Sequence, residues 1–159
     1  MNGSEFAKIV DIIRGAFPHM DRFKDDDVKD VWFECLEDLE YGKARTATLN
    51  AIKSAREFPP SIADIRAEYE VLEEAERKIR GEIKNSYDNI KSYYPGSGGA
   101  NYGWAEFQER AKTPEDARAL SQMIFQFVRQ CENEKCDNTP DFAEVIKGIR
   151  REGERLVIE

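Results

Sequence analysis

Few side chains in this 159-residue sequence have the types and spacing that catalysis or metal binding requires. His19 is the only histidine, and no recognisable nucleophile motif surrounds it, so the sequence offers no Ser/His/Asp or Cys/His constellation. Cys131 and Cys136 could supply half of a zinc site, but no second Cys/His pair completes the four ligands. We therefore expect no catalytic residues, no metal and no cofactor.

Carboxylates are numerous, and their number alone accounts for their spacing. Asp and Glu make up 32 of 159 residues, so pairs at helical spacing arise without a catalytic purpose. The glycine-rich stretch at 95–100 lacks the Gly-Lys-Ser/Thr ending of a P-loop and the glycine spacing of a dinucleotide-binding loop. The sequence therefore predicts a protein that is not an enzyme.

Acidic residues gather between positions 21 and 40, where nine Asp and Glu stand against three Lys and Arg. The net charge of the chain is −8, which argues against direct nucleic-acid binding because that function needs a basic surface. Two interpretations of the acidic segment stay open: a solvated helix face, with acids where the helix dipole favours them, or an acidic surface for a basic partner. The candidate residues of that surface are Asp26, Asp30, Glu34 and Glu37.

Residues 58–65, here called the hinge, predict the end of one helix and the start of a longer one. Pro59 and Pro60 cannot continue a helix, since proline lacks an N–H and biases its predecessor away from helical angles. Ser61 and Asp64 then have the N-cap and N3 spacing of a capping box. The hinge residues with predicted structural roles are Phe58, Pro59, Pro60, Ser61, Asp64 and Ile65.

The helix that follows the hinge can be traced to about residue 94 by its hydrophobic period. Apolar residues recur at alternating steps of three and four with two polar interruptions, which is typical of a heptad repeat. We expect this face to pack on the chain's own C-terminal helices, because those helices also have apolar faces. The alternative is self-association through the same face, at Ile79, Ile83 and Ile90.

Shorter helices are predicted on both sides of this long one. Tyr41-Gly42 is expected to end the second helix, and Thr139-Pro140 has the residue types of a helix start before the last one. No segment alternates convincingly enough to be a strand, so the sequence predicts an all-α fold. The expected helices before the hinge are 4–17, 26–39 and 43–57. The expected parts of the chain are an N-terminal helical bundle at 1–75, a connecting long helix at 76–95, a flexible glycine-rich loop at 96–103 and a C-terminal helical module at 104–159.

Composition adds expectations about the setting of the protein. No apolar run approaches the length of a membrane span, and no secretory signal peptide is recognisable. Three cysteines, an odd count, favour a reduced and therefore cytoplasmic location. Gly3-Ser4-Glu5-Phe6 fits either a cloning remnant or the start of the first helix, where Phe6 is in phase with later apolar positions.

Three segments together resemble the phage replicative helicase loader/inhibitor family. They are Ala16-Phe17-Pro18 at the end of the first helix, residues 32–36 in the second helix, and the hinge. The likeness covers about residues 6–75. It implies a small helical protein without ATPase activity that binds the hexameric replicative helicase and holds it inactive. It also implies delivery of that helicase to a phage origin through an origin-binding initiator.

The leading hypothesis is therefore a phage DNA replication adaptor that binds, inhibits and helps load the helicase. In the resembled family the C-terminal segment is associated with helicase binding, whereas here the second half carries helix caps and apolar faces. The alternative is an acidic decoy that uses the residues between 26 and 37 to block a nucleic-acid-binding surface of a host or defence protein. For the adaptor, the predicted contact is a groove-filling face of the last helix, at Phe142, Ile146, Ile149 and Arg150.

Overall fold

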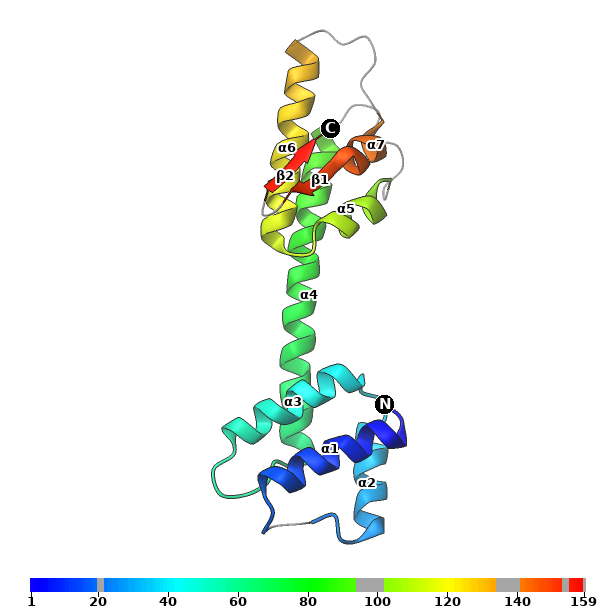
Figure 1. Ribbon diagram of the computed structural model, residues 1–159, viewed down its shortest axis with the longest axis vertical. Helices are drawn as coiled ribbons and strands as arrows, with labels where there is room; N and C mark the ends of the chain where they lie inside the picture. Colours follow the sequence, from blue (N-terminus) through cyan, green and yellow to red (C-terminus); the bar gives the residue numbers. More distant parts are fainter. Residues whose placement is uncertain (20–21, 94–101, 134–140, 153–154, 159) are drawn as a thin grey trace. The chain divides into compact units, whose positions relative to one another are not determined.

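A computed structural model describes residues 1–19, 22–93, 102–133, 141–152 and 155–158 of the chain (Figure 1). Seven helices and one two-stranded sheet make up the regular structure of these residues. The predicted all-α class is confirmed, with a short C-terminal hairpin that the sequence did not predict. The chain divides into two compact units, here called unit 1 (Met1–Glu76) and unit 2 (Arg77–Glu159).

Helix α1 spans Gly3–Ala16 and begins with a capping box. Asn2 Oδ1 accepts a hydrogen bond from Glu5 N at 3.0 Å, and Glu5 Oε2 accepts one from Asn2 N at 2.8 Å. Phe6 is buried in the core of unit 1. Gly3-Ser4-Glu5-Phe6 therefore form the first turn of α1 and take part in the fold.

Helix α2 spans Asp26–Leu36 and helix α3 spans Tyr41–Ser54. The prediction that Tyr41-Gly42 ends the second helix is wrong, because these two residues begin the third. The chain turns earlier, where Leu39 is 5% exposed and its N–H donates to Leu36 O at 3.1 Å. Burial of the Leu39 side chain therefore places the turn at residues 37–40, a tertiary effect that the local sequence does not signal.

Unit 1 is closed by α1, which lies against α3, and by the start of α4 (Ile62–Tyr93). Alanines on α3 are buried and allow the helices to approach closely, while Phe23 and Trp32 make an edge-to-face contact at 4.9 Å between ring centroids. The buried apolar residues of this core are Phe6, Ile9, Val10, Ile13, Phe23, Trp32, Leu36, Leu39, Ala44, Ala47, Ala51 and Ile65.

Helix α4 confirms the long helix predicted after the hinge, and the two units bury different parts of its apolar face. Ile65 is fully buried in unit 1, whereas Ile83 and Ile90 are buried in unit 2. Ile79 is 43% exposed. The intramolecular packing expected for Ile83 and Ile90 is thus present, and self-association stays a prediction.

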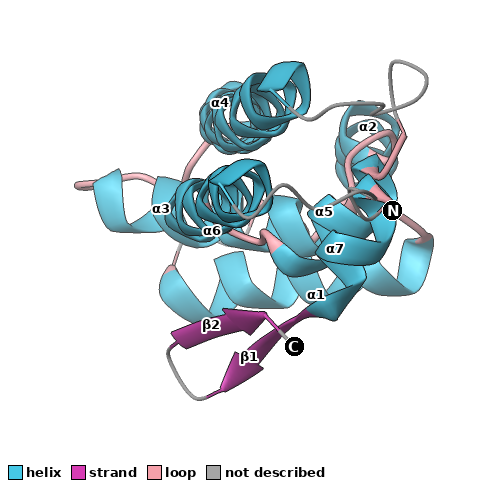
Figure 2. Cartoon of the chain, turned by 90° about the horizontal axis from the view of Figure 1, so that it is seen from above, coloured by secondary structure: helices cyan, strands magenta, loops and turns pink. Residues whose placement is uncertain are grey.

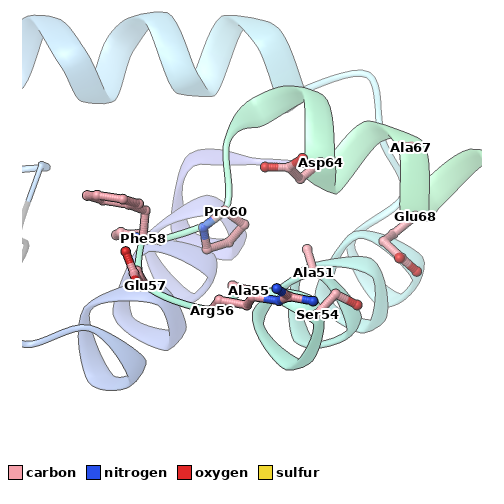
Figure 3. A pocket seen from close by; sticks show the side chains of 11 residues that line it. Ala51, Ser54, Ala55, Arg56, Glu57, Phe58, Pro60, Asp64, Ala67 and Glu68 are labelled. Carbon is pink, nitrogen blue, oxygen red and sulfur yellow. The ribbon is translucent and has the colours of Figure 1, made fainter.

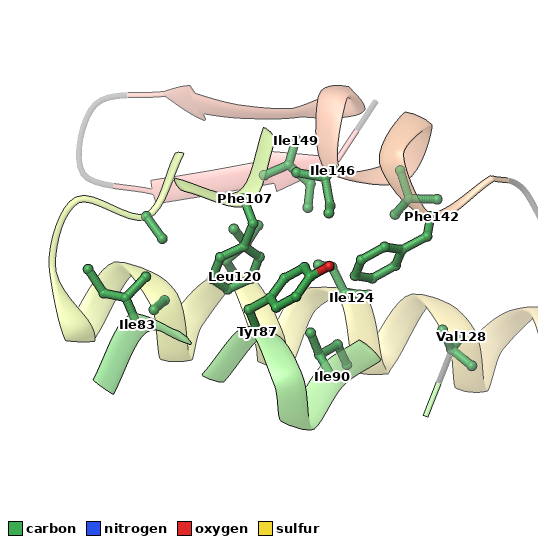
Figure 4. Close-up of a cluster of buried hydrophobic side chains, with 13 residues drawn as sticks. Ile83, Tyr87, Ile90, Phe107, Leu120, Ile124, Val128, Phe142, Ile146 and Ile149 are labelled. Atoms are coloured by element: carbon green, nitrogen blue, oxygen red, sulfur yellow. The ribbon is translucent and has the colours of Figure 1, made fainter. Parts of the chain in front are cut away.

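Unit 2 contains the remainder of α4, α5 (Trp104–Arg110), α6 (Pro114–Asn133) and α7 (Phe142–Gly148). Its core is built around Tyr87, which is fully buried and whose hydroxyl donates to Tyr102 O at 2.5 Å (Figure 4). The ring centroids of Trp104 and Phe107 lie 5.0 and 5.5 Å from that of Tyr87. Aromatic packing therefore organises this unit.

The C-terminal residues form an antiparallel hairpin of β1 (Ile149–Glu152) and β2 (Arg155–Ile158), with Ile149 paired to Ile158 (Figure 2). The prediction that the last helix continues to Ile149 is wrong, since α7 ends at Gly148. Glycine ends helices readily and β-branched residues favour strands. Arg110 also fixes this junction, because its guanidinium donates to Lys147 O at 2.7 Å and to Ile149 O at 2.9 Å.

Two predicted connections lie largely outside the described residues. Of the glycine-rich loop predicted at 96–103, the structure describes only the end, where Gly103 has a φ of 77° and precedes α5. The predicted helix start at Thr139-Pro140 also lies outside the described residues. In the structure Asp141 is the N-cap of α7, and its Oδ1 accepts from the N–H groups of Ala143 and Glu144 at 3.0 and 3.2 Å.

Candidate partner-binding surfaces

The apolar residues predicted to contact a partner lie in the core of unit 2. Phe142, Ile146 and Ile149 are 1%, 0% and 1% exposed, and Figure 4 shows them pointing toward Tyr87. Arg150 lies in β1 rather than on a helix, and its side chain is outside the described part of the chain. The predicted exposed helix face is therefore corrected: an apolar face at helical spacing serves the fold here, and these side chains are not accessible in the folded chain.

The acidic residues, in contrast, lie on the surface of α2. Trp32 and Leu36 hold the inner face of the helix in the core, so Asp30 and Glu34 are exposed on its outer face and Glu37 follows at its end. The Asp26 side chain is 89% exposed at the start of the helix. We call the residues Asp26, Asp30, Glu34 and Glu37 the acidic face.

The acidic face has local features that favour the charged state of its carboxylates. Asp25 is the N-cap of α2, and its Oδ1 accepts from Asp27 N at 3.0 Å. Lys29 Nζ lies 2.6 Å from Asp26 Oδ1, and this hydrogen bond and the lysine charge lower the pKa of the Asp26 carboxyl. Val31 is 54% exposed on the same helix, so the acidic face includes an apolar side chain. Such a surface can bind a basic partner.

Charge is divided unequally between the two units. Unit 1 contains 10 Lys and Arg against 18 Asp and Glu, whereas unit 2 contains 14 against 14. The formal charge of −8 is thus carried by unit 1. Any long-range attraction of a basic partner is therefore directed to the unit that contains the acidic face.

The hinge positions its residues through backbone hydrogen bonds. Ser61 N donates to Asp64 Oδ2 at 2.7 Å, and Asp64 N donates to Ser61 Oγ at 3.2 Å, which together form a capping box. These hydrogen bonds lower the pKa of the Asp64 carboxyl. Ile65 is fully buried one residue later. The start of α4 is thus fixed in unit 1 at both its polar and its apolar side.

A second set of contacts fixes the chain before the capping box. The Arg22 guanidinium donates to Pro59 O at 3.0 Å and to Pro60 O at 3.5 Å, and it also lies over the Trp32 ring at 5.6 Å. Both prolines are buried. Phe58, one residue earlier, is 68% exposed, although burial of a phenylalanine side chain stabilises a fold by about 1.5–3 kcal/mol. Sequence reasoning assigned Phe58 a structural role, because apolar type alone does not show which residue of a turn faces solvent.

The described residues contain no group of three or more His, Cys, Asp and Glu side chains that could hold a metal ion. Cys35 is a half-buried free thiol, whereas the Cys131 side chain and Cys136 lie outside what the structure describes. A search of the described helices finds no segment long and apolar enough to cross a membrane.

Comparison with protein families gives one match, over residues 1–66, to the N-terminal domain of a phage helicase loader/inhibitor. The family resemblance predicted from the sequence is therefore confirmed over these residues. The matched segment includes α1, α2, α3, the hinge and the first turn of α4. Neither the curated proteins nor the solved structures gave a match to the chain.

Proposed function

We propose that this protein is an adaptor of phage DNA replication that binds the hexameric replicative helicase, inhibits it and helps load it at the origin. The observation that carries the proposal is the match of residues 1–66 to the N-terminal domain of a phage helicase loader/inhibitor. The matched residues form most of unit 1 and end just after the hinge, whose capping box and buried prolines are part of the folded unit. An origin-binding initiator is the proposed second partner.

In this proposal the protein acts by binding, and ATP hydrolysis belongs to the helicase. An inhibitor that does no chemistry shifts its target only as far as it binds one state of the target more tightly than another. We therefore propose that the adaptor has a higher affinity for an inactive helicase than for a helicase translocating on DNA. Loading then requires that the initiator and origin DNA weaken this preference.

Co-purification tests the proposed function. The tagged full-length chain is expected to retain the hexameric replicative helicase from lysate of infected cells and to form a complex with the purified helicase. A matched control is the chain with Tyr87→Ala, which removes a core side chain of unit 2 and leaves the family-matched segment unchanged. Absence of a complex between the two purified proteins at micromolar concentration would contradict the proposal.

The acidic face supports a second candidate function, an acidic decoy that blocks a nucleic-acid-binding surface of a host or defence protein. Its carboxylates are exposed and the unit that carries them has a charge of −8. Charge reversal by Asp26→Lys, Asp30→Lys and Glu34→Lys separates the two functions. A decoy should lose its target and bind it with a steep dependence on salt, since exposed charges are screened within about 10 Å at 0.1 M salt. An adaptor with apolar contacts should lose little.

A further inference from the structure

A groove of about 630 Å³ lies beside the hinge in unit 1, bordered by the end of α3, the hinge and the first turns of α4 (Figure 3). Phe58 stands at one end of the groove and Glu68 at the other. Small apolar side chains and the two prolines form much of its surface. The apolar lining residues are Ala51, Ala55, Phe58, Pro59, Pro60 and Ala67.

The walls of this groove are held in place by contacts outside it. Arg22 donates to the carbonyls of Pro59 and Pro60, and the capping box of Ser61 and Asp64 fixes the start of α4. Ala51 is 4% exposed, so the α3 side rests directly on the core. A groove whose walls are already ordered loses little conformational entropy when a ligand binds, which favours affinity.

Phe58 differs from its neighbours in this ordered setting. It is 68% exposed, whereas the two prolines that follow it are buried. The hydrogen bonds from Arg22 fix the backbone that presents its ring. Exposed aromatic rings on ordered backbone are the type of side chain that contributes most at protein interfaces, where they fill or border a pocket.

The charges around the groove determine which occupant fits it. Glu57, Asp64 and Glu68 line it with negative charge, and Arg56 is the basic residue of the lining. This excess of two carboxylates has the same sign as the charge of −8 on unit 1. Electrostatic complementarity therefore favours an occupant with positive charge. The alanine and proline surface requires that the occupant also present apolar side chains.

We propose that this groove binds a basic amphipathic helix of a partner protein, with apolar side chains of that helix packed against Phe58 and the alanine floor. Lysine or arginine residues beside those apolar positions would pair with Glu57 and Glu68. This is the helix-in-groove mode of peptide recognition, in which residues at i, i+4 and i+7 act as anchors. The proposal concerns unit 1 alone and stands independently of the helicase as the partner.

A displayed library of short amphipathic helical peptides provides the probe. Leucine is fixed at i, i+4 and i+7, and Lys, Glu, Gln and Ser vary at random between these positions. Selection on the full-length chain is expected to enrich lysine. A selected peptide should shift the amide resonances of Ala51, Phe58 and Ala67 and bind about tenfold or more weakly to the Phe58→Ser chain, as for an interface hot spot.

Three matched variants make the result specific to the groove. Val71→Ser changes another exposed apolar residue of unit 1, 62% exposed on α4, and should leave binding unchanged. Glu57→Lys with Glu68→Lys should weaken binding, whereas reversal of the acidic face at Asp26, Asp30 and Glu34 should not. No selected peptide, enrichment of glutamate, or equal binding to the Phe58→Ser chain would overturn the proposal. A dimer that Phe58→Ser converts to a monomer would overturn it in favour of a second copy as the occupant.

Discussion

Unit 1 and unit 2 are both helical, but they are stabilised and charged in different ways. In unit 1, long polar side chains reach backbone carbonyls of other elements: Arg66 donates to Cys35 O at 2.6 and 2.9 Å, and Arg22 donates to the hinge prolines. In unit 2, the buried Tyr87 ring contacts three other aromatic rings, those of Trp104, Phe107 and Phe142. Unit 1 carries the net charge of −8, whereas unit 2 is balanced.

This difference bears on which parts of the chain the family match can explain. The match ends at residue 66, within unit 1. The partner contact predicted in unit 2 is instead part of its core, whereas the acidic face and Phe58 of unit 1 are exposed. The exposed candidates for partner binding named here therefore lie in unit 1, and a role for unit 2 has to be measured directly.

The largest effect is expected from Tyr87→Ala, which removes the centre of the unit 2 core. Truncation of a buried aromatic side chain costs about 3–5 kcal/mol of unfolding free energy, and this change also removes the hydrogen bond to Tyr102 O. The two tryptophans report on the units separately, since Trp32 lies in unit 1 and Trp104 in unit 2. Urea unfolding of single-tryptophan variants, Trp32→Phe and Trp104→Phe, should show a shift for Trp104 only.

Tyr93→Ala is the control for this comparison, because Tyr93 is 65% exposed on the same helix. It should change the unfolding free energy by less than about 0.5 kcal/mol. Equal shifts of the Trp32 and Trp104 transitions in the Tyr87→Ala chain would show that the two units unfold as one, and the comparison would then fail.

A pair of glycine substitutions should have opposite signs. Gly103 has a φ of 77°, and a Cβ there would lie 2.9 Å from the Phe142 ring, so Gly103→Ala should destabilise unit 2 by about 1–3 kcal/mol. Gly81 is inside α4, where a Cβ would have no atom within 4 Å. Gly81→Ala should therefore stabilise the helix by about 0.5–1 kcal/mol. Thermal unfolding measures both, and the same sign for both changes would contradict the geometry of Gly103.

A smaller effect is expected in unit 1 from loss of the capping box. Ser61→Ala removes the acceptor of the Asp64 N–H and should cost about 1 kcal/mol. The Trp32 transition should shift and the Trp104 transition should not. Phe58→Ser, three residues earlier, should leave stability within about 0.5 kcal/mol because its ring is exposed. A large loss of stability in the Phe58→Ser chain would show that this ring supports the fold.

The smallest effect concerns acid. The pKa of Asp64 is lowered by hydrogen bonds from Ser61, and that of Asp141 by the Tyr102 hydroxyl and two backbone N–H groups. A carboxyl with a lower pKa in the folded than in the unfolded state stabilises the fold above its unfolded value, here 3.8, and loses that contribution as pH falls through the folded value. Acid titration should therefore destabilise both units below about pH 4.

Asparagine variants assign the acid response to each unit, because asparagine keeps a side-chain acceptor and does not titrate. Asp64→Asn should reduce the acid dependence of the Trp32 signal, and Asp141→Asn that of the Trp104 signal. Exchange of these two patterns, or no change in either variant, would contradict the assignment.

The sequence predicted what local signals determine. Ser61 and Asp64 start α4 because a capping box needs only two residues at fixed spacing, and the period of apolar residues carries α4 to Tyr93. The break before α3 was misplaced because burial of Leu39 is a tertiary effect. The C-terminal hairpin was missed because its strands have four residues each, although Gly153 between Glu152 and Arg155 is a recognised turn signal.

The candidate site was less predictable than the fold. Phe142, Ile146 and Ile149 have the spacing of a helix face, and the same spacing fits a core or a groove-filling contact. Only the packing of unit 2 decides between these two uses. The exposure of Phe58 likewise depends on Arg22 and the buried prolines, which come together from distant positions in the chain. The acidic face was easier, since charged residues opposite Trp32 and Leu36 on one helix have to face solvent.

The most direct test of the proposed function is titration of the purified replicative helicase with the full-length chain while ATP hydrolysis and complex mass are measured together. The adaptor proposal predicts that ATPase activity falls as a complex forms and that both changes saturate at the same stoichiometry. Unchanged ATPase activity with no complex detected by light scattering at micromolar concentrations would contradict it.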